Sequence, residues 1–337
     1  MATYKQAGVN ISMGDICSQI AYKYAMTTFG SRTGLKGTAV REQGGFTGSI
    51  DMGDYLLVQN ADGVGTKAMI AEMMGRYDTL GRDLVAMVAD DAVCVGAEAI
   101  AITNVIDTNK VDKKVIEPLM RGLASVCRQQ KILIPGGEIA ELSEMVNGLS
   151  WNATAIGIVE KKKLINGKSI RPGDVIVGLH SKNFRSNGFT LVRYILKKEY
   201  GKNWHMKSFN GKRWGDITLE PSIVFSDAVL SLIGRFGKKS IVNVKGVAHI
   251  TGGGIHGNLP RMFGKRKLKY VLDNLPKPPA AMPELIRMGR VPLNDAFDTW
   301  NMGVGMVLAV AKKDAEKAMA LLKKKGITSS VIGKVTA

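Results

Sequence analysis

The chain has 337 residues, of which 45% are hydrophobic and 23% charged, and 39 are glycine. This length fits two domains with ample cores, and the composition is that of a globular enzyme rather than a disordered or fibrous protein. No apolar run is long enough to span a bilayer, and the N-terminus lacks a basic region followed by an apolar core. We therefore expect neither a membrane span nor a secretory signal.

The formal net charge of +18 would raise the local concentration of any polyanion near the surface. The basic residues are scattered, however, and the aromatic residues, 6% of the chain, do not alternate with them. We therefore expect a generally basic surface and no nucleic-acid partner. Cys17, Cys94 and Cys127 have neither metal-site nor disulfide spacing, which favours a reducing, cytoplasmic location.

Strands and helices alternate from residue 54 onward, whereas the first fifty residues show little regular pattern apart from one predicted helix at 15–28. In the helix predicted at 80–95, apolar residues recur on one face. The other elements predicted in the first half are the strands 55–59, 99–106, 131–135 and 151–159 and the helices 67–74 and 114–129.

A polar, charged passage over 161–172 separates the two halves, and we place the domain boundary there, between 1–165 and 166–337. The elements predicted in the second half are the strands 175–179, 303–310 and 330–335 and the helices 189–199, 221–236 and 313–325. The last strand, helix and strand follow a βαβ pattern. The fold class is therefore mixed α/β, with helices covering the C-terminal sheet.

The stretch from Asn60 to Lys67 combines a carboxylate, two glycines, a hydroxyl and an ammonium within one predicted strand-to-helix turn. Gly63 and Gly65 would let backbone N–H groups approach phosphate oxygens, while Lys67 offers a cation and Asp62 an oxygen ligand for Mg²⁺. The spacing is not that of a Walker A loop. Taken alone, the stretch is equally compatible with an ordinary turn.

Further acidic residues occur at two places. Asp90 and Asp91 end an otherwise apolar helix face, so at least one of them should meet a cation unless this end of the helix is solvated. Gly136-Gly137-Glu138 follows a predicted strand directly, so we expect Glu138 in a turn at the carboxyl end of that strand, where α/β sheets place ligands. Asp62, Asp91 and Glu138 would suit the sparse carboxylate ligation that Mg²⁺ prefers.

Nine segments occur in the order found in the aminoimidazole ribonucleotide synthetase family, also called phosphoribosylformylglycinamidine cyclo-ligases, which the chain resembles from about residue 4 to 335. They are Tyr4–Val9, Gly44-Gly45-Phe46, Asp62–Lys67, Asp78–Met87, Gly96-Ala97-Glu98, Gly136-Gly137-Glu138, Ser186-Asn187-Gly188, Thr251–Gly254 and Asn301–Met306. A single glycine motif would be weak evidence, but nine in register are specific.

The resemblance implies a two-domain protein in which 1–165 binds ATP and dimerises and 166–337 contributes substrate and nucleotide contacts. It also implies a homodimer whose N-terminal mixed sheets join into a barrel, and ATP bound with Mg²⁺ near the dimer interface; a need for K⁺ stays open. In the implied reaction, ATP phosphorylates the formyl-amide oxygen of formylglycinamidine ribonucleotide. The amidine-side nitrogen then attacks that carbon, phosphate leaves and the imidazole ring closes.

Matching to the family motifs implies site residues as well. The implied catalytic residues are Asp62, Lys67 and Glu138, and the implied metal ligands are Asp62, Asp91 and Glu138. The implied nucleotide contacts are Asp62, Gly63, Gly65, Thr66, Lys67, Asp91, Gly136, Gly137 and Glu138. The implied substrate contacts are Gly44, Gly45, Phe46, Ser186, Asn187, Thr251, Gly252 and Gly253.

Four positions depart from the family pattern: Arg185 stands where His is usual, Ile139 for Thr, Asn104 for Asp, and Asp298 for Arg. From the sequence alone we expect Arg185→His to be tolerated. Two alternatives remain open. One is another ATP-using member of the superfamily, such as a small-molecule kinase or a selenophosphate-synthetase-like enzyme. The other is a degenerate relative that binds nucleotide without turnover.

Overall fold

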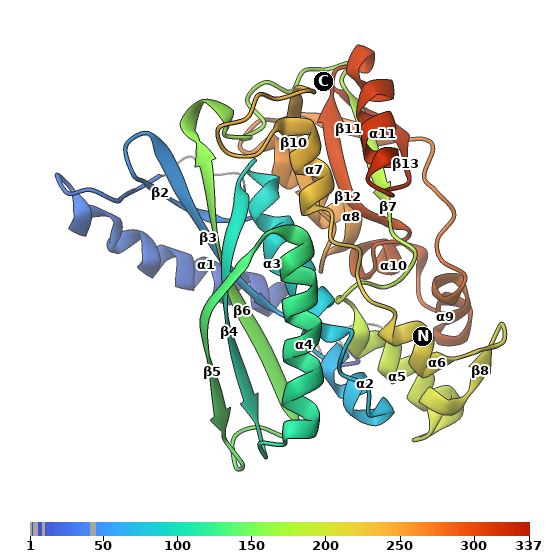
Figure 1. Ribbon diagram of the computed structural model, residues 1–337. Helices are drawn as coiled ribbons and strands as arrows, with labels where there is room; N and C mark the ends of the chain where they lie inside the picture. The colour runs from blue at the N-terminus through green and yellow to red at the C-terminus, as the bar shows by residue number, and fades with distance from the viewer. Residues whose placement is uncertain (1, 3–5, 9–10, 41–44) are drawn as a thin grey trace.

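The computed structural model describes residues 2, 6–8, 11–40 and 45–337 (Figure 1). Two sheets form its framework, a six-stranded sheet in the order β1-β2-β3-β6-β4-β5 and a five-stranded sheet in the order β10-β12-β7-β13-β11. This arrangement confirms the mixed α/β class. Gly44 and the segment 3–5 lie outside the described residues. No helix in the described part of the chain has the length and apolar character needed to cross a bilayer.

The six-stranded sheet is antiparallel except for the pair β4–β5. Three helices pack against one of its faces: α2 (Lys67–Met74), α3 (Leu80–Cys94) and α4 (Lys113–Gln130). The strands are β1 (Thr38–Ala39), β2 (Gly48–Asp51), β3 (Tyr55–Gly63), β4 (Glu98–Thr108), β5 (Leu133–Glu141) and β6 (Leu149–Glu160).

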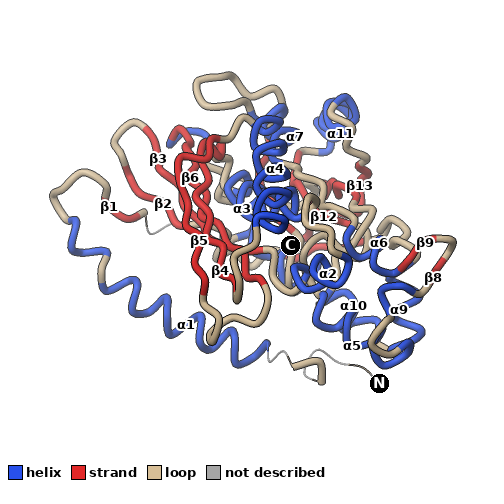
Figure 2. The backbone as a smooth tube through the Cα atoms, turned by 60° about the horizontal axis from the view of Figure 1, so that its bottom comes forward, coloured by secondary structure: helices blue, strands red, loops and turns tan. Residues whose placement is uncertain are grey.

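The opposite face of this sheet carries apolar side chains that no described helix packs closely against. Val105 and Leu133 are 40% and 71% exposed. Helix α1 (Ile11–Thr27) runs along this side, away from α3 and α4 (Figure 2). Its residues at 13–14 and 16–27 are exposed. We call this surface the open face.

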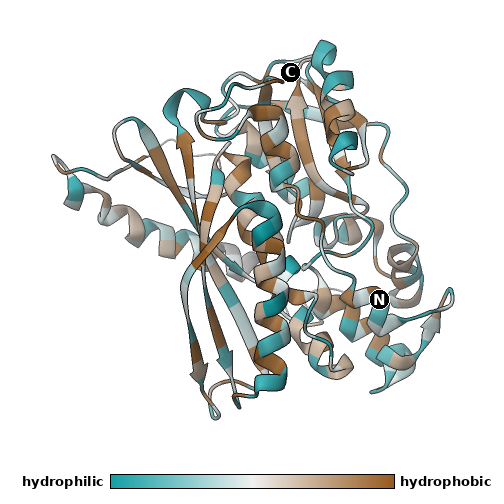
Figure 3. Ribbon diagram, in the orientation of Figure 1, coloured by the Kyte–Doolittle hydropathy of each residue, from teal (hydrophilic) through white to brown (hydrophobic). Residues whose placement is uncertain are grey.

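The five-stranded sheet pairs all its strands antiparallel. Its central strands are continuous apolar runs, coloured brown in Figure 3. Such runs are typical of strands that helices cover. The strands are β7 (Val175–His180), β10 (Val244–His249), β11 (Lys269–Leu272), β12 (Val304–Val310) and β13 (Ser329–Thr336), and the covering helices include α7 (Ser226–Ile233) and α11 (Ala315–Lys324). Since β12 and β13 both run antiparallel to β7, β12-α11-β13 is the predicted βαβ unit.

Helix α3 lies between the two sheets, in contact with β3, β4 and β6 on one side and with β10 and α7 on the other. Almost every α3 side chain is therefore buried, including those of Asp83 and Asp90. A buried carboxylate is unfavourable unless hydrogen-bond donors or cations surround it, so both acids need such partners at the junction of the two sheets.

The remaining elements come from the second half but pack into the same hydrophobic cluster as the six-stranded sheet. They include the 3₁₀ helix at 204–206, the hairpin β8 (Ser208–Phe209) and β9 (Lys212–Arg213), and the helices α5 (Phe189–Tyr200), α6 (Trp214–Leu219), α9 (Ala281–Gly289) and α10 (Leu293–Thr299). Helix α8 (Gly254–Asn258) instead contributes Ile255 to the cluster of the five-stranded sheet. The hydrophobic clusters thus do not follow the two halves of the sequence.

Most predicted elements are confirmed, with two differences that matter for the site. The helix predicted at 221–236 forms only over Ser226–Ile233, because backbone N–H groups before it bind side chains of α3 instead of helical carbonyls. It ends at Gly234, whose φ is +77°. The second difference is that Gly136-Gly137-Glu138 lies inside β5, not in a turn after it.

Candidate functional site

Asp62 stands at the end of β3, on the same side of the strand as the buried Leu56 and Val58 and hence facing α3. The chain there passes very close to β6. A Cβ at Gly63 would lie 2.1 Å from Asn152 Oδ1 and 2.8 Å from a backbone carbonyl oxygen, so only glycine fits. The Gly63 N–H donates to Asp62 Oδ1 over 2.7 Å. The turn thus fixes one oxygen of this carboxylate.

Asp91 is the acidic side chain of α3 whose negative charge acts on Asp62. Burial, and then the negative charge of Asp91, raise the pKa of Asp62 to about 6. Burial raises the pKa of Asp91 to about 7, against the opposing effect of Arg261 and Arg185. His249 Nδ1 lies 2.8 Å from Asp91 Oδ1. Among the described residues no hydrogen-bond donor is bonded to the second oxygen of Asp62 or of Asp91, so one oxygen of each carboxylate is left for a ligand.

Asp90, the neighbour of Asp91, has a different environment. Its Oδ2 lies 2.9 Å from Arg185 Nη2, and its Oδ1 accepts the backbone N–H groups of Phe225 and Ser226 at 2.8 and 2.9 Å. The expectation that one of the two acids meets a cation is confirmed for Asp90, and the cation is an arginine. Asp91 is left as the acid available to a ligand.

Lys67 is fully buried, and its ammonium group is surrounded by protein acceptors. Nζ lies 2.9 and 2.8 Å from the two oxygens of Asp83, 3.0 Å from the Arg185 carbonyl oxygen and 2.8 Å from the Glu220 carbonyl oxygen. Asp83 Oδ1 also accepts from Ser222 N–H over 2.9 Å. Lys67 therefore links the Asp62 turn to loops of the second half. Its contact with phosphate stays a prediction.

Glu138 is exposed on β5 and does not join the other two acids within one chain. The strand register runs from Glu138 through Val105 and Asn152 to Gly63, three strands away. At about 4.8 Å per strand this separation is about 14 Å. Glu138 shares the side of Val105, which is the open face, whereas Asp62 faces α3. In the part of the chain that the structure describes, no three acidic, His or Cys side chains form a metal site.

The neutral loops lie beside the Asp62 turn. A Cβ at Gly65 would lie 4.0 Å from the Ser186 carbonyl oxygen, and one at Gly252 would lie 3.8 Å from Asn187 Nδ2. Ser186 Oγ and Asn187 Oδ1 are buried without a hydrogen-bond partner among the described residues. Asn258 Nδ2 donates to the carbonyl oxygens of Gly252 and Gly254 at 3.0 and 2.8 Å. The loops are thus held in place, while two polar atoms between them lack partners.

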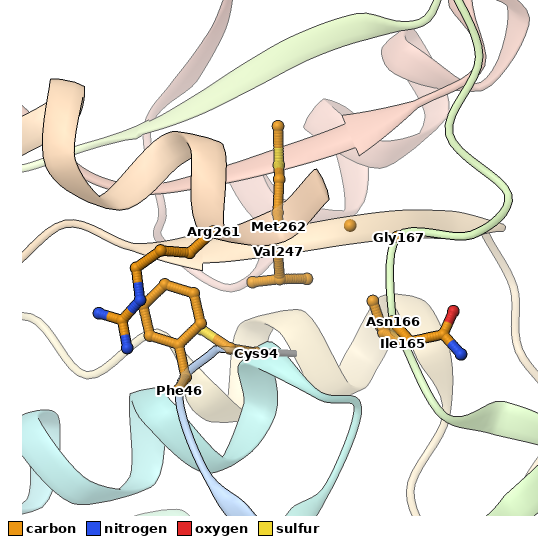
Figure 4. A pocket seen from close by; sticks show the side chains of 9 residues that line it. Phe46, Cys94, Ile165, Asn166, Gly167, Val247, Arg261 and Met262 are labelled. Carbon is orange, nitrogen blue, oxygen red and sulfur yellow. The ribbon is translucent and has the colours of Figure 1, made fainter. Parts of the chain in front are cut away.

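Arg261 is a residue of this region that the sequence patterns did not single out. Its guanidinium carbon lies 3.8 Å from the ring centroid of Phe46, and its Nη2 donates to the Gly45 carbonyl oxygen. Figure 4 shows it stacked on Phe46 next to Cys94, beside a cavity of about 10 Å³ that has room for one water at most. Arg261 therefore joins the Gly45-Phe46 segment to the second half, close to Asp91.

Three of the four residues that differ from the family pattern lie in ordinary structural surroundings. The buried Asn104 accepts a hydrogen bond from Trp151 Nε1 at 3.0 Å. Ile139 is exposed on β5. Asp298 lies 3.1 Å from His256 Nδ1, and both side chains are about half exposed. Arg185, the fourth, is 1% exposed and central to the site.

Comparisons with known proteins assign both halves of the chain to one family. Residues 47–159 match the family model "AIR synthase related protein, N-terminal domain", and residues 171–337 match "AIR synthase related protein, C-terminal domain". The phosphoribosylformylglycinamidine cyclo-ligase of Thermococcus kodakarensis is 39% identical over 99% of this chain and 96% of that protein. The protein of the same name from Methanocaldococcus jannaschii is 36% identical over 99% and 92%.

Solved structures share the fold at low sequence identity. The HypE–HypF complex aligns with a TM-score of 0.61 and 16% identity over 86% of each chain. T. maritima PurL complexed with ATP aligns with a TM-score of 0.57 and 17% identity, over 86% of this chain and 42% of that one. These likenesses concern the fold alone. The relatives from T. kodakarensis and M. jannaschii, by contrast, are 39% and 36% identical over 99% of this chain. The chain therefore belongs to the phosphoribosylformylglycinamidine cyclo-ligase family.

Proposed function

We propose that the chain catalyses the ATP-dependent ring closure of formylglycinamidine ribonucleotide to aminoimidazole ribonucleotide, with release of ADP and phosphate. The observation that carries this proposal is the pair Asp62 and Asp91, each with one oxygen held by an N–H donor and one left over. The pair lies beside the polar loops at Ser186-Asn187 and Thr251–Gly254. Carboxylates, backbone amides and hydroxyls suffice for phosphoryl transfer, which depends on positioning and charge neutralisation.

The two carboxylates fit a magnesium ion. Their raised pKa values, about 6 for Asp62 and about 7 for Asp91, mean that two negative charges in this place are unfavourable without a cation. Mg²⁺ commonly takes one or two carboxylates and completes its shell with water and phosphate oxygens. When bound, it would neutralise charge on the nucleotide phosphates. Asp62 and Asp91 would hold it through their remaining oxygens.

The polar loops would bind the ribonucleotide. The buried Ser186 Oγ and Asn187 Oδ1 lack protein partners, which is unfavourable unless a ligand or water supplies them. In the proposed reaction, a phosphoryl group passes from ATP to the formyl-amide oxygen. The amidine-side nitrogen then attacks the same carbon, loses its proton, and the C–O bond to phosphate breaks as the ring closes. The loops would orient this nitrogen toward the carbon.

We further propose that the enzyme is a homodimer in which the open face is covered by a second copy and the two sheets join into a barrel. Val105 and Leu133 are apolar and exposed on this face, and an exposed apolar sheet surface of this kind is typical of an interface. Glu138 projects from the same face, so its nucleotide or metal role would depend on the assembled dimer. Leu133→Asp should then lower both the oligomeric mass measured by sedimentation and the activity.

The decisive experiment supplies purified protein with ATP, Mg²⁺ and formylglycinamidine ribonucleotide and measures ADP and aminoimidazole ribonucleotide. Equal amounts of both are expected. ATP binding without either product would instead identify a degenerate relative, and phosphorylation of a different small molecule would identify a kinase. A division at residues 165/166, a cytoplasmic location and a need for K⁺ belong to the same proposal, and omission of K⁺ from the assay tests the last.

A further inference from the structure

Four side chains, three of them fully buried, form a continuous chain of contacts from the junction of the two sheets to the proposed metal site. Asp90 Oδ2 lies 2.9 Å from Arg185 Nη2, the same Nη2 lies 2.7 Å from His249 Nε2, and His249 Nδ1 lies 2.8 Å from Asp91 Oδ1. Arg185 is 1% exposed, and Asp90 and His249 are 0% exposed. Water therefore does not compete for these contacts along the first part of the chain.

The direction of each hydrogen bond follows from the chemistry of arginine. A guanidinium group only donates, so the lone pair of His249 Nε2 must accept from Arg185 Nη2. The imidazole then carries its single proton on Nδ1, and this N–H donates to Asp91 Oδ1. Arg185 thus selects the tautomer of His249, and the tautomer decides which group donates to Asp91.

We propose that Arg185 is a positioning residue for the metal site: through His249 it holds Asp91 Oδ1 and leaves Asp91 Oδ2 as the oxygen available to a cation. This inference rests on the proposed function. Asp62 has the matching arrangement, because Gly63 N–H holds its Oδ1. The two acids would then each offer one oxygen from a fixed orientation.

The backbone of Arg185 is arranged to aim its side chain inward. Its φ is +59°, an uncommon value for a residue other than glycine. Its N–H donates to Asn183 Oδ1 over 2.9 Å and its carbonyl oxygen accepts from Lys67 Nζ over 3.0 Å. The guanidinium also donates to the Ile223 carbonyl oxygen over 2.8 Å and lies 4.8 Å from the Phe225 ring centroid. These contacts hold the side chain rigidly enough to orient a neighbour.

Histidine is the usual residue at position 185 in the family pattern, and its imidazole could not make the same set of contacts. It carries at most two N–H groups and is shorter, so it cannot serve Asp90, His249 and the Ile223 carbonyl oxygen together. A neutral imidazole also accepts as well as donates, so it would not fix the tautomer of His249 by itself. The device is therefore specific to a chain with arginine here.

The first test uses the unaltered protein without metal or nucleotide, labelled with ¹⁵N-histidine. Long-range ¹H–¹⁵N correlation spectra distinguish the two neutral tautomers, and His249→Gln assigns the signal by its disappearance. We expect a neutral ring protonated on Nδ1. A neutral ring protonated on Nε2, or a doubly protonated ring, overturns the inference irrespective of the enzyme's activity.

The second test measures Mn²⁺ binding by electron paramagnetic resonance in the presence of a non-hydrolysable ATP analogue. Loss of an outer partner of a metal ligand commonly weakens binding about 10- to 100-fold. We expect a loss of that size for Arg185→Lys. The matched control is Arg235→Lys, because Arg235 also pairs with two acids, Glu98 and Asp227, at 2.5 and 2.6 Å but away from the site. It should leave Mn²⁺ affinity unchanged.

Should Arg185→Lys fail to fold, the pair His249→Gln and His249→Leu replaces it. Gln keeps an N–H donor for Asp91 and should retain most of the Mn²⁺ affinity, whereas Leu should lose it about 10-fold or more. Equal affinities in Gln and Leu variants, or unchanged affinity in a folded Arg185→Lys, contradict the inference. Failure of the unaltered protein to bind Mn²⁺ with nucleotide would instead count against the proposed function, and the tautomer measurement would still judge the positioning role of Arg185.

Discussion

Lys67 Nζ lies 2.8 Å from Asp83 Oδ2, and both side chains are completely buried. The lysine comes directly after the turn that carries Asp62, while the aspartate lies on α3, the helix between the two sheets. Because Asp83 also accepts from the Ser222 N–H, the ion pair ties the turn, the helix and a loop of the second half together. Removing one partner would leave an uncompensated buried charge.

We therefore expect Lys67→Met to destabilise the protein by about 3–5 kcal/mol, the usual cost of breaking a buried ion pair from one side. Urea unfolding followed by circular dichroism measures this. The double variant Lys67→Met/Asp83→Leu is the control and should recover part of the loss, since no buried charge remains unpaired. If Lys67→Met kept its stability and lost only ATP affinity, the predicted phosphate contact would be supported instead.

Asp62→Asn and Asp91→Asn should lower turnover by about 10²-fold or more while leaving the fold intact, as expected for groups that place charge in a transition state. Asp90→Asn should behave differently, because its carboxylate pairs with Arg185 and accepts two backbone N–H groups. We expect it mainly to lower the melting temperature. Initial rates and thermal melts of the three variants separate these outcomes, and wild-type turnover in Asp62→Asn would remove that residue from the site.

The contribution of Asp62 and Asp91 to the stability of the metal-free protein should fall as the pH rises from about 4 to 7. The pKa values of Asp62 and Asp91 are raised from 3.8 to about 6 and about 7, so over this range the folded protein keeps protons that the unfolded chain releases. These two groups therefore favour folding at the acidic end. Protons also compete with a cation for the same oxygens, so Mg²⁺ affinity should increase between pH 5.5 and 7.5. Melting temperatures with and without Mg²⁺ test both parts, and pH-independent Mg²⁺ binding would contradict them.

The sequence was sufficient for the elements that depend on local patterns. Glycine spacing identified the Asp62 turn, and alternating or helical apolar spacing identified the strands and helices around it. It could not separate Asp90 from Asp91, because neighbouring residues on a helix point about 100° apart and their partners, Phe225 and His249, lie far away in the chain. The face of Glu138 likewise depends on the register of β5 against β4, which no local pattern sets.

Lys67 is another residue whose contacts depend on parts of the chain far away in the sequence. Its residue type next to two glycines indicates a phosphate site, but its acceptors are Asp83, Arg185 and Glu220, up to 153 residues away. Only tertiary packing brings them to its ammonium group. Arg261 had one available signal, its place just after the Thr251–Gly254 loop, but no sequence pattern indicated that its side chain would return to Phe46.

Arg185→His, which the sequence alone suggested would be tolerated, should instead destabilise the protein. The guanidinium satisfies the buried Asp90 and the Ile223 carbonyl oxygen together, and a shorter imidazole cannot reach both. The cost is about 3–5 kcal/mol if the Asp90 charge is left unpaired. Denaturant unfolding at pH 8 measures it, with Arg235→His as a control at a more exposed ion pair. Retention of wild-type stability would show that Asp90 finds another donor.

Arg261 combines two roles that substitutions can separate. Its stacking on Phe46 and its hydrogen bond to the Gly45 carbonyl oxygen hold the segment that leads into β2, whereas its charge lies close enough to Asp91 to lower the pKa of that acid.

Arg261→Gln removes the charge and should raise the KM for MgATP or for the ribonucleotide about 10-fold or more, the usual effect of losing a charged hydrogen bond of 1.5–3 kcal/mol. Phe46→Leu keeps the charge and removes the stacking, so it should reduce stability by roughly 1 kcal/mol and leave both KM values within about twofold. If Phe46→Leu raised KM as much as Arg261→Gln, the position of the segment and not the charge would govern binding, because loosening the Gly45-Phe46 segment would then be enough to disturb the site.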